Sequence, residues 1–103
     1  MHPIIEKHLN EIIRTCRNRN VERLALFGSA ADGRFEPGRS DLDLLVEFTK
    51  MTPAEHAEQY FGLIEDLERL LGCPIDLVEP GPITNPFFRQ SLEQSQVVLY
   101  AAA

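Results

Sequence analysis

Apolar residues near the start of the chain recur at spacings of three and four, which is typical of an amphipathic helix. The stripe consists of Ile4, Ile5, Leu9, Ile12, Ile13 and Cys16. Asn18, Arg19 and Asn20 follow and end the pattern. We therefore predict one helix whose apolar stripe packs against the rest of the protein.

The pattern then changes to short apolar runs separated by turn residues, which predicts strands. One strand covers residues 21–27 and stops at Gly28, and a second, apolar enough to be central, covers 42–48. Residues 30–40 contain Gly33, Pro37 and Gly38 and are predicted to form a turn and a loop. A third short strand is expected at 74–78.

A longer helix is predicted between the second and third strands. Thr52 suits the N-cap, Pro53 the first helical position, and Glu55 the return bond of a capping box. The helix should run to Leu71, because Gly72 suits a left-handed C-terminal cap. Its expected buried face consists of Ala57, Tyr60, Phe61, Ile64, Leu67, Leu70 and Leu71.

The last part of the chain contains a proline-rich loop at 79–86, a predicted helix at 87–94 and an extended segment at 97–100. Phe87 and Phe88 are expected to pack this helix on the sheet. Helices and strands in this order predict an α/β (α+β) fold, with a small mixed sheet flanked by helices. The length fits a single domain spanning 1–103.

Charge and composition narrow the function. A net charge of −6 disfavours direct nucleic acid binding, because such binding depends on clustered Lys and Arg. No apolar run is long enough for a membrane span or a signal peptide, so we expect a soluble, cytoplasmic protein. Cys16 and Cys73 lack metal or redox spacing and are interpreted as buried or idle thiols.

Asp41 and Asp43 are two residues apart at the start of the second strand, so their side chains should leave the same face. Two carboxylates held together repel, and a cation between them relieves the repulsion. Hard oxygen ligands suit Mg²⁺, which takes further ligands from water and substrate phosphates. Taken alone, the pattern fits two solvated aspartates on an exposed edge strand equally well.

Gly28 and Ser29 follow the first strand directly. Glycine lets the backbone bend closely around an anion, and the Ser29 hydroxyl and nearby amides can donate to phosphate oxygens if a short helix opens there. Alone, Gly-Ser is an ordinary turn. In combination with the Asp-x-Asp strand, it predicts a phosphate site that faces a metal site.

Asp76 is the third candidate carboxylate. It lies between Ile75 and Leu77 and should therefore face away from the core, on the side where Asp41 and Asp43 are expected. The alternative is a surface aspartate. Three carboxylates that bind two metal ions can lower the pKa of an attacking hydroxyl and neutralise a leaving pyrophosphate.

These segments resemble the minimal nucleotidyltransferase (MNT) family of the DNA polymerase β-like superfamily over nearly the whole chain. The resemblance rests on Leu26-Phe27-Gly28-Ser29, Asp41-Leu42-Asp43-Leu44-Leu45-Val46, Pro74-Ile75-Asp76-Leu77-Val78, Asn85-Pro86-Phe87-Phe88-Arg89 and Val97-Val98-Leu99-Tyr100. It implies a nucleotidyltransferase fold with ATP as substrate and Mg²⁺ as cofactor. It also implies that Gly28 and Ser29 hold phosphates, that Asp41 and Asp43 bind metal, and that Asp76 completes the catalytic and metal-binding site.

Small members of this family resemble antitoxins of HEPN/MNT toxin–antitoxin pairs, which silence a helical RNase toxin by transferring AMP to one of its tyrosines. The resemblance therefore implies a HEPN-like toxin as partner in a heteromeric complex. Asp32 departs from the family pattern, because an Arg is frequent at that place in the turn. This departure keeps open a non-catalytic antitoxin that acts by binding. A small-molecule nucleotidyltransferase of the aminoglycoside-modifying type is a second alternative.

Overall fold

The computed structural model describes residues 2–36, 38–81, 86–87, 90 and 96–102. Its elements in chain order are α1 (Pro3–Lys7), α2 (Leu9–Asn18), β1 (Val21–Leu26), α3 (Ser29–Asp32), β2 (Leu42–Phe48), α4 (Pro53–Leu71), β3 (Ile75–Val78) and β4 (Val97–Ala101). The strands form a four-stranded sheet in the order β3-β2-β1-β4. The predicted strands are confirmed, with bounds that differ by one residue at an end.

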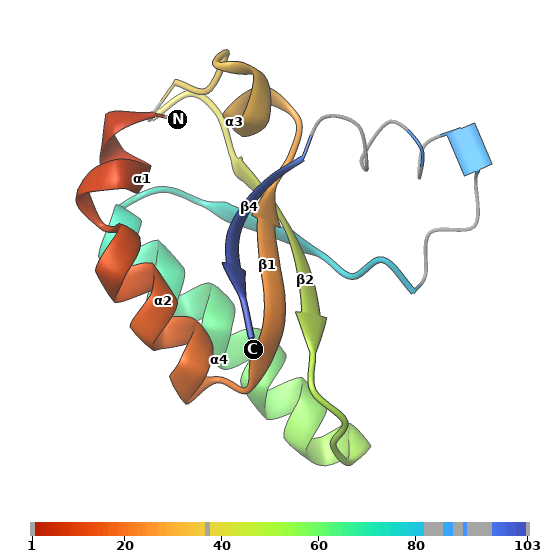
Figure 1. Ribbon diagram of the computed structural model, residues 1–103. Coiled ribbons are helices and arrows are strands. Elements are labelled where there is room, and N and C mark those ends of the chain that lie inside the picture. The colour runs from red at the N-terminus through yellow and green to blue at the C-terminus, as the bar shows by residue number, and fades with distance from the viewer. Residues whose placement is uncertain (1, 37, 82–85, 88–89, 91–95, 103) are drawn as a thin grey trace.

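The sheet is mixed, as predicted. β1 pairs antiparallel with β2 and β4, whereas β2 and β3 run parallel. A parallel pair needs a crossover connection, and α4 supplies it. Figure 1 shows α1, α2 and α4 on one side of the sheet, which leaves the other face clear of these helices. The predicted fold class, a small mixed sheet flanked by helices, is confirmed.

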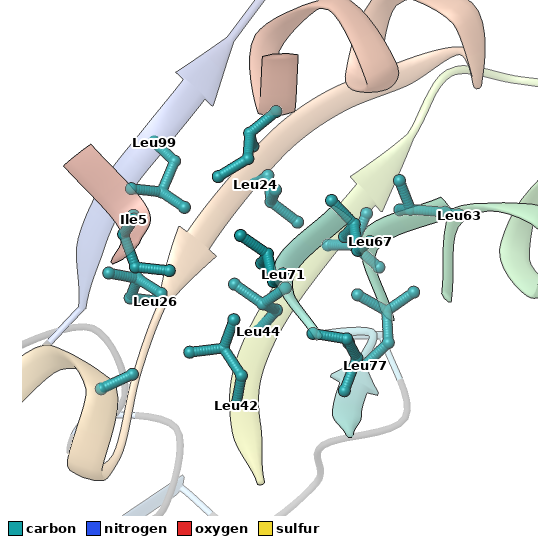
Figure 2. Close-up of a cluster of buried hydrophobic side chains, with 14 of the residues drawn as sticks. Ile5, Leu24, Leu26, Leu42, Leu44, Leu63, Leu67, Leu71, Leu77 and Leu99 are labelled. Atoms are coloured by element: carbon teal, nitrogen blue, oxygen red, sulfur yellow. The ribbon is translucent and has the colours of Figure 1, made fainter. Parts of the chain in front are cut away.

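The core lies between this sheet and the helices that cover it. Leu24, Leu26, Leu42 and Leu44 project from the central strands and are at most 1% exposed. Figure 2 shows these leucines, with Leu77 of β3 and Leu99 of β4, grouped with Ile5, Leu63, Leu67 and Leu71 from the helices. Because successive side chains of a strand point to opposite faces, Leu42 and Leu44 of β2 both lie in the core.

The N-terminal segment differs from the prediction, because two helices replace the single one. The break is at His8, whose backbone N–H donates to the Ile5 carbonyl three residues back and whose ring Nδ1 lies 2.9 Å from the Ile4 carbonyl oxygen. This tighter turn interrupts regular helical bonding. Ile5 and Ile12, on either side of the break, are both 1% exposed, so the break keeps both in the core.

The ends of α4 are as predicted. The Thr52 hydroxyl oxygen accepts the Glu55 backbone N–H at 3.2 Å, and Gly72 ends the helix in the left-handed conformation, at φ 69°. The return bond of the capping box is different, because the Glu55 carboxylate accepts from the Thr52 hydroxyl at 3.1 Å. Both ends of the crossover helix are therefore fixed by local hydrogen bonds.

The predicted buried face of α4 is partly wrong. Ala57 and Phe61 are exposed, Phe61 by 66%, whereas Leu63, which the prediction omitted, is fully buried. Leu63, Leu67 and Leu71 form the buried stripe at four-residue spacing. Phe61 precedes Leu63 by two residues, which turns its side chain about 200° around the helix, away from the core.

The C-terminal predictions are described only in part. Residues 79–81 are irregular, as expected of the loop, and 82–85 lie outside the described residues. Residues 86–87 and 90 are helical, whereas 88–89 and 91–94 of the predicted helix, Phe88 included, lie outside them. Phe87 is 82% exposed, so its predicted packing on the sheet is wrong. Adjacent helical side chains point about 100° apart, which lets one ring of such a pair face solvent.

Both cysteines are buried free thiols, in agreement with the sequence interpretation. Burial raises the pKa of the Cys16 thiol to about 12, so this side chain behaves as a small apolar core residue. Among the described helices, none has the length and apolar character needed to cross a lipid bilayer.

Candidate active site

The parallel pairing of β2 and β3 brings two of the predicted aspartates side by side. Asp43 of β2 and Asp76 of β3 are direct partners in the register. Leu42 and Leu44, the neighbours of Asp43, are 0% and 1% exposed in the core. Because side chains alternate along a strand, Asp43 and Asp76 leave the face of the sheet opposite the helices.

The environment of Asp43 is electrostatically unfavourable for a charged carboxylate. Its side chain is half-buried, and burial is the first cause that raises the pKa of Asp43. The charge of Asp76, a side-chain hydrogen bond with Asp76 and the charge of Asp41 raise this pKa further. Asp41 immediately precedes β2 and is exposed. Asp41 and Asp76, the other two predicted carboxylates, therefore both act on Asp43.

The donor set of this cluster fits a hard divalent cation. Carboxylates that repel one another are stabilised by a cation between them, and oxygen ligands are those that Mg²⁺ prefers. Among the described residues, no three or more His, Cys, Asp or Glu side chains are arranged to hold a metal ion. Mg²⁺ commonly keeps several waters and takes ligands from substrate phosphates, so aspartates that form no complete cage by themselves still suit it.

The Gly28-Ser29 turn lies directly against Asp43. The Phe27 N–H donates to the Asp43 carbonyl oxygen at 3.1 Å, which ties the end of β1 to the start of β2. Gly28 has φ +61°, and a Cβ atom built on it would lie 2.6 Å from Asp43 Oδ2. Only glycine satisfies both the positive φ and this close approach.

The short helix expected after the turn is present as α3, with Gly28 as its N-cap and Gly33 as its left-handed C-cap. The Ser29 carbonyl oxygen accepts the N–H groups of Arg34 and Phe35, at 2.9 and 3.0 Å, and so turns the chain back after α3. The predicted phosphate-binding turn and the predicted metal ligands thus lie at the same end of the sheet.

The sequence did not predict the hydrogen bonds that side chains of α4 form with the backbone beside Asp76. Tyr60 donates its hydroxyl hydrogen to the Leu77 carbonyl oxygen at 2.6 Å, and the Glu68 carboxylate accepts the Ile75 N–H at 3.0 Å. The His56 ring is hydrogen-bonded to the carboxylate of Glu79, the residue directly after β3. β3 and the residue that follows it bring these partners to α4, and the sequence carries no signal for these pairings.

A mixed sheet that brings a glycine turn and a set of aspartates together on its open face is suited to binding the phosphates of a nucleotide. A match to a family model gives the family of the chain. Residues 9–99 match the model of the nucleotidyltransferase domain, and the chain belongs to that family.

Two curated relatives come from Methanocaldococcus jannaschii. They are named "Putative protein adenylyltransferase MJ1379" and "Putative protein adenylyltransferase MJ0128", and each is 39% identical to this chain over 77 residues. These residues are 75% of this chain in both cases, and 75% and 74% of the respective relatives. The resemblance to the minimal nucleotidyltransferases is therefore supported by sequence as well as by fold.

The solved structures agree. One described as "Structure of putative minimal nucleotidyltransferase" matches with a TM-score of 0.71 and 30% identity, over 90% of both chains. A toxin–antitoxin structure with AMP-PNP matches at 0.67 and 23% identity, over 91% of this chain and 73% of that one. An MntA–HepT toxin–antitoxin structure matches at 0.61 and 20%, over 94% and 73%. The last two support the fold alone.

Proposed function

We propose that this nucleotidyltransferase moves AMP from ATP to a tyrosine hydroxyl of a HEPN-type RNase toxin and thereby acts as its antitoxin. The observation that carries the proposal is the register pair Asp43–Asp76 with Gly28 packed against Asp43. The names of the two Methanocaldococcus jannaschii relatives support protein adenylylation, and the toxin is carried into this proposal from toxin–antitoxin structures that share the fold.

Each site residue has a distinct task in this proposal. Gly28 and Ser29 hold the phosphates of ATP, and Asp41 and Asp43 hold Mg²⁺ together with Asp76. When bound, Mg²⁺ supplies positive charge that stabilises the negative charge on the reacting phosphates. Positioning and electrostatics of this kind provide most of the catalysis in phosphate transfer.

The transfer forms a bond between the tyrosine oxygen and the α-phosphorus and breaks the bond from that phosphorus to the pyrophosphate. Asp76, on the edge strand, is the carboxylate that orients the attacking hydroxyl and accepts its proton. Pyrophosphate leaves on the side of Gly28 and Ser29. An Asp76→Asn variant should therefore keep ATP binding at the Gly28-Ser29 turn, bind the metal more weakly and lose transfer.

The protein acceptor also has a task in this proposal. The sheet and the Gly28-Ser29 turn supply the nucleotide site, and the acceptor hydroxyl has to be held in line with the α-phosphate. Because in-line positioning of the acceptor contributes several kcal/mol to the barrier reduction, a folded partner has to bring its own docking surface. The net charge of −6 favours a basic partner such as an RNA-cleaving enzyme.

The test is to incubate this protein and the toxin with ATP and Mg²⁺ and to weigh the toxin by intact mass spectrometry. We expect the toxin to gain AMP and to lose RNase activity, and the Asp41→Asn, Asp43→Asn double variant to do neither. An unmodified toxin that both proteins inhibit equally would overturn the transfer and favour a non-catalytic antitoxin. Transfer to an aminoglycoside in place of the toxin would favour the small-molecule alternative.

A further inference from the structure

The strand that carries Asp76 lies at an edge of the described sheet. Successive residues of a strand direct their backbone N–H and C=O groups to opposite edges. The Pro74 carbonyl oxygen accepts the Leu42 N–H at 2.9 Å, so Pro74 faces β2. Asp76, two residues on, also faces β2, whereas Ile75 and Leu77 direct their backbone groups to the free edge.

Two side chains of α4 bind the backbone groups at this edge. Glu68 Oε2 accepts the Ile75 N–H at 3.0 Å, and the Tyr60 hydroxyl donates to the Leu77 carbonyl oxygen at 2.6 Å. Ile75 and Leu77 are the residues immediately before and after Asp76. The backbone on both sides of the third carboxylate is therefore held by hydrogen bonds from the crossover helix.

The hydrogen bonds from Glu68 and Tyr60 are both able to hold the backbone of β3 in one position. The bond to Glu68 has a carboxylate acceptor, which makes it stronger than a neutral bond. Tyr60 is half-buried, with its ring in edge-to-face contact with Phe61 at 5.2 Å between centroids. Burial, followed by the charges of Glu79 and Asp76, raises the pKa of Tyr60, which keeps the hydroxyl protonated as a donor.

We propose that Tyr60 and Glu68 are positioning residues that hold Asp76 opposite Asp43 in the geometry needed for metal binding and transfer. Without them, β3 would be held by β2 on one side only, and the carboxylate of Asp76 would move relative to Asp43. The inference rests on the proposed function, because it assigns Tyr60 and Glu68 to the same site. It adds a role for residues that do not themselves contact the substrate.

The experiment compares matched substitutions in the purified full chain. Tyr60→Phe removes only the hydroxyl, and its control is Tyr100→Phe on β4, at the opposite edge of the sheet. Glu68→Ala removes the acceptor, and its control is Glu65→Ala, an exposed residue of the same helix that pairs with Arg69. Glu68→Gln keeps an acceptor oxygen for the Ile75 N–H and is the rescue variant.

The main readout is Mn²⁺ binding in the presence of ATP, measured by electron paramagnetic resonance. Loss of a group that orients a metal ligand commonly weakens metal binding by about 10- to 100-fold. We expect Tyr60→Phe and Glu68→Ala to weaken Mn²⁺ binding by at least about tenfold. Glu68→Gln and both controls should stay within about twofold of wild type, because each keeps the hydrogen bonds at the edge of β3.

Amide hydrogen exchange, measured by NMR, provides a second readout that needs no metal. The Ile75 amide should exchange faster in Glu68→Ala than in Glu65→Ala, with the core strands unchanged. The proposal is overturned if Tyr60→Phe and Glu68→Ala bind Mn²⁺ as their controls do, or if Glu68→Gln is as impaired as Glu68→Ala. If the wild type transfers no AMP while the Mn²⁺ pattern holds, the proposed function fails and the positioning role stands.

Discussion

The two faces of the sheet use the same strands for opposite purposes. On the helix side, Leu42, Leu44 and Val46 of β2 are at most 1% exposed and belong to the main core. On the other side, Asp43 faces Asp76, next to a small apolar cluster that contains Phe27 and Leu45. Along β2, residues that stabilise the fold therefore alternate with Asp43, whose charge raises the free energy of the folded state.

This division predicts that substitutions on the two faces have separable effects. A change on the helix side should lower the free energy of unfolding. A change on the carboxylate side should lower activity and leave stability unchanged or improved, because active sites commonly retain unfavourable interactions that function requires.

The largest effect is expected at Asp43. Asp43→Asn keeps the shape of the side chain and removes a charged oxygen ligand, so we expect transfer to fall by about 10³-fold, or ~4 kcal/mol of barrier. The melting temperature without metal should not fall, because repulsion with Asp76 is removed. The rate at which the toxin gains the mass of AMP, beside thermal unfolding in EDTA, measures both. If Asp43→Asn is inactive because it is unfolded, the two faces do not have separable effects on activity and stability.

Leu44→Ala, one residue further along β2, should have the converse effect. Truncation of a fully buried leucine typically lowers the free energy of unfolding by ~3 kcal/mol. Val98→Ala, at a residue that is 46% exposed, is the control and should change stability by less than about 0.5 kcal/mol. Urea denaturation measures both, and equal losses would show that the helix side is not the main source of stability.

Gly28→Ala should affect both stability and ATP binding, because Gly28 contacts the Asp43 carboxylate. Gly28 has φ 61° and ψ −141°, a sparsely populated conformation that costs a non-glycine residue about 1–3 kcal/mol, so stability should fall by that amount. The new Cβ would also displace the Asp43 carboxylate, and Mg²⁺-dependent ATP binding should be lost. Gly33→Ala is the matched control, since Gly33 also has positive φ but has open space around it. It should lose stability and keep ATP binding.

The smallest effect is the dependence of stability on pH. Because the folded pKa of Asp43 is raised, its protonated form is favoured in the folded state. Its contribution to stability is complete below the unfolded pKa and is lost as pH rises through the folded pKa. In EDTA, Asp43→Asn should therefore gain stability relative to wild type as pH rises above the ordinary Asp pKa of about 3.9. A difference that is constant with pH would contradict the raised pKa.

Helices, strands and candidate site residues could be predicted from the sequence where neighbouring residues alone determine the conformation. Strand alternation places Leu42 and Leu44 inside and Asp43 outside, and the caps at Thr52 and Gly72 depend on a few adjacent residues. The parallel register that brings Asp76 to Asp43 is not local, but the alternation of β3 was enough to choose the correct face.

The sequence was insufficient for residues whose environment depends on contacts with distant parts of the chain. Arg19, which the sequence shows only as a residue that ends the first helix, forms an ion pair with Asp66 of α4 at 2.8 Å. Phe61 was assigned to the core by its hydrophobicity, whereas the positions of the sheet and α2 select the stripe through Leu63. Glu68 and Tyr60 bind a strand that the sequence does not show to be an edge. Apolar periodicity contains no information on such partners.

The crossover through α4 has a consequence for the order of folding. β1 and β2 pair antiparallel and are close in sequence, whereas β3 can join β2 only after the chain has passed through a 19-residue helix. Contacts that close longer loops form at a greater entropic cost. The repulsive pair Asp43–Asp76 should therefore assemble late, and its unfavourable energy would appear mainly in the unfolding rate. Stopped-flow kinetics of Asp43→Asn should show slower unfolding with little change in the folding rate.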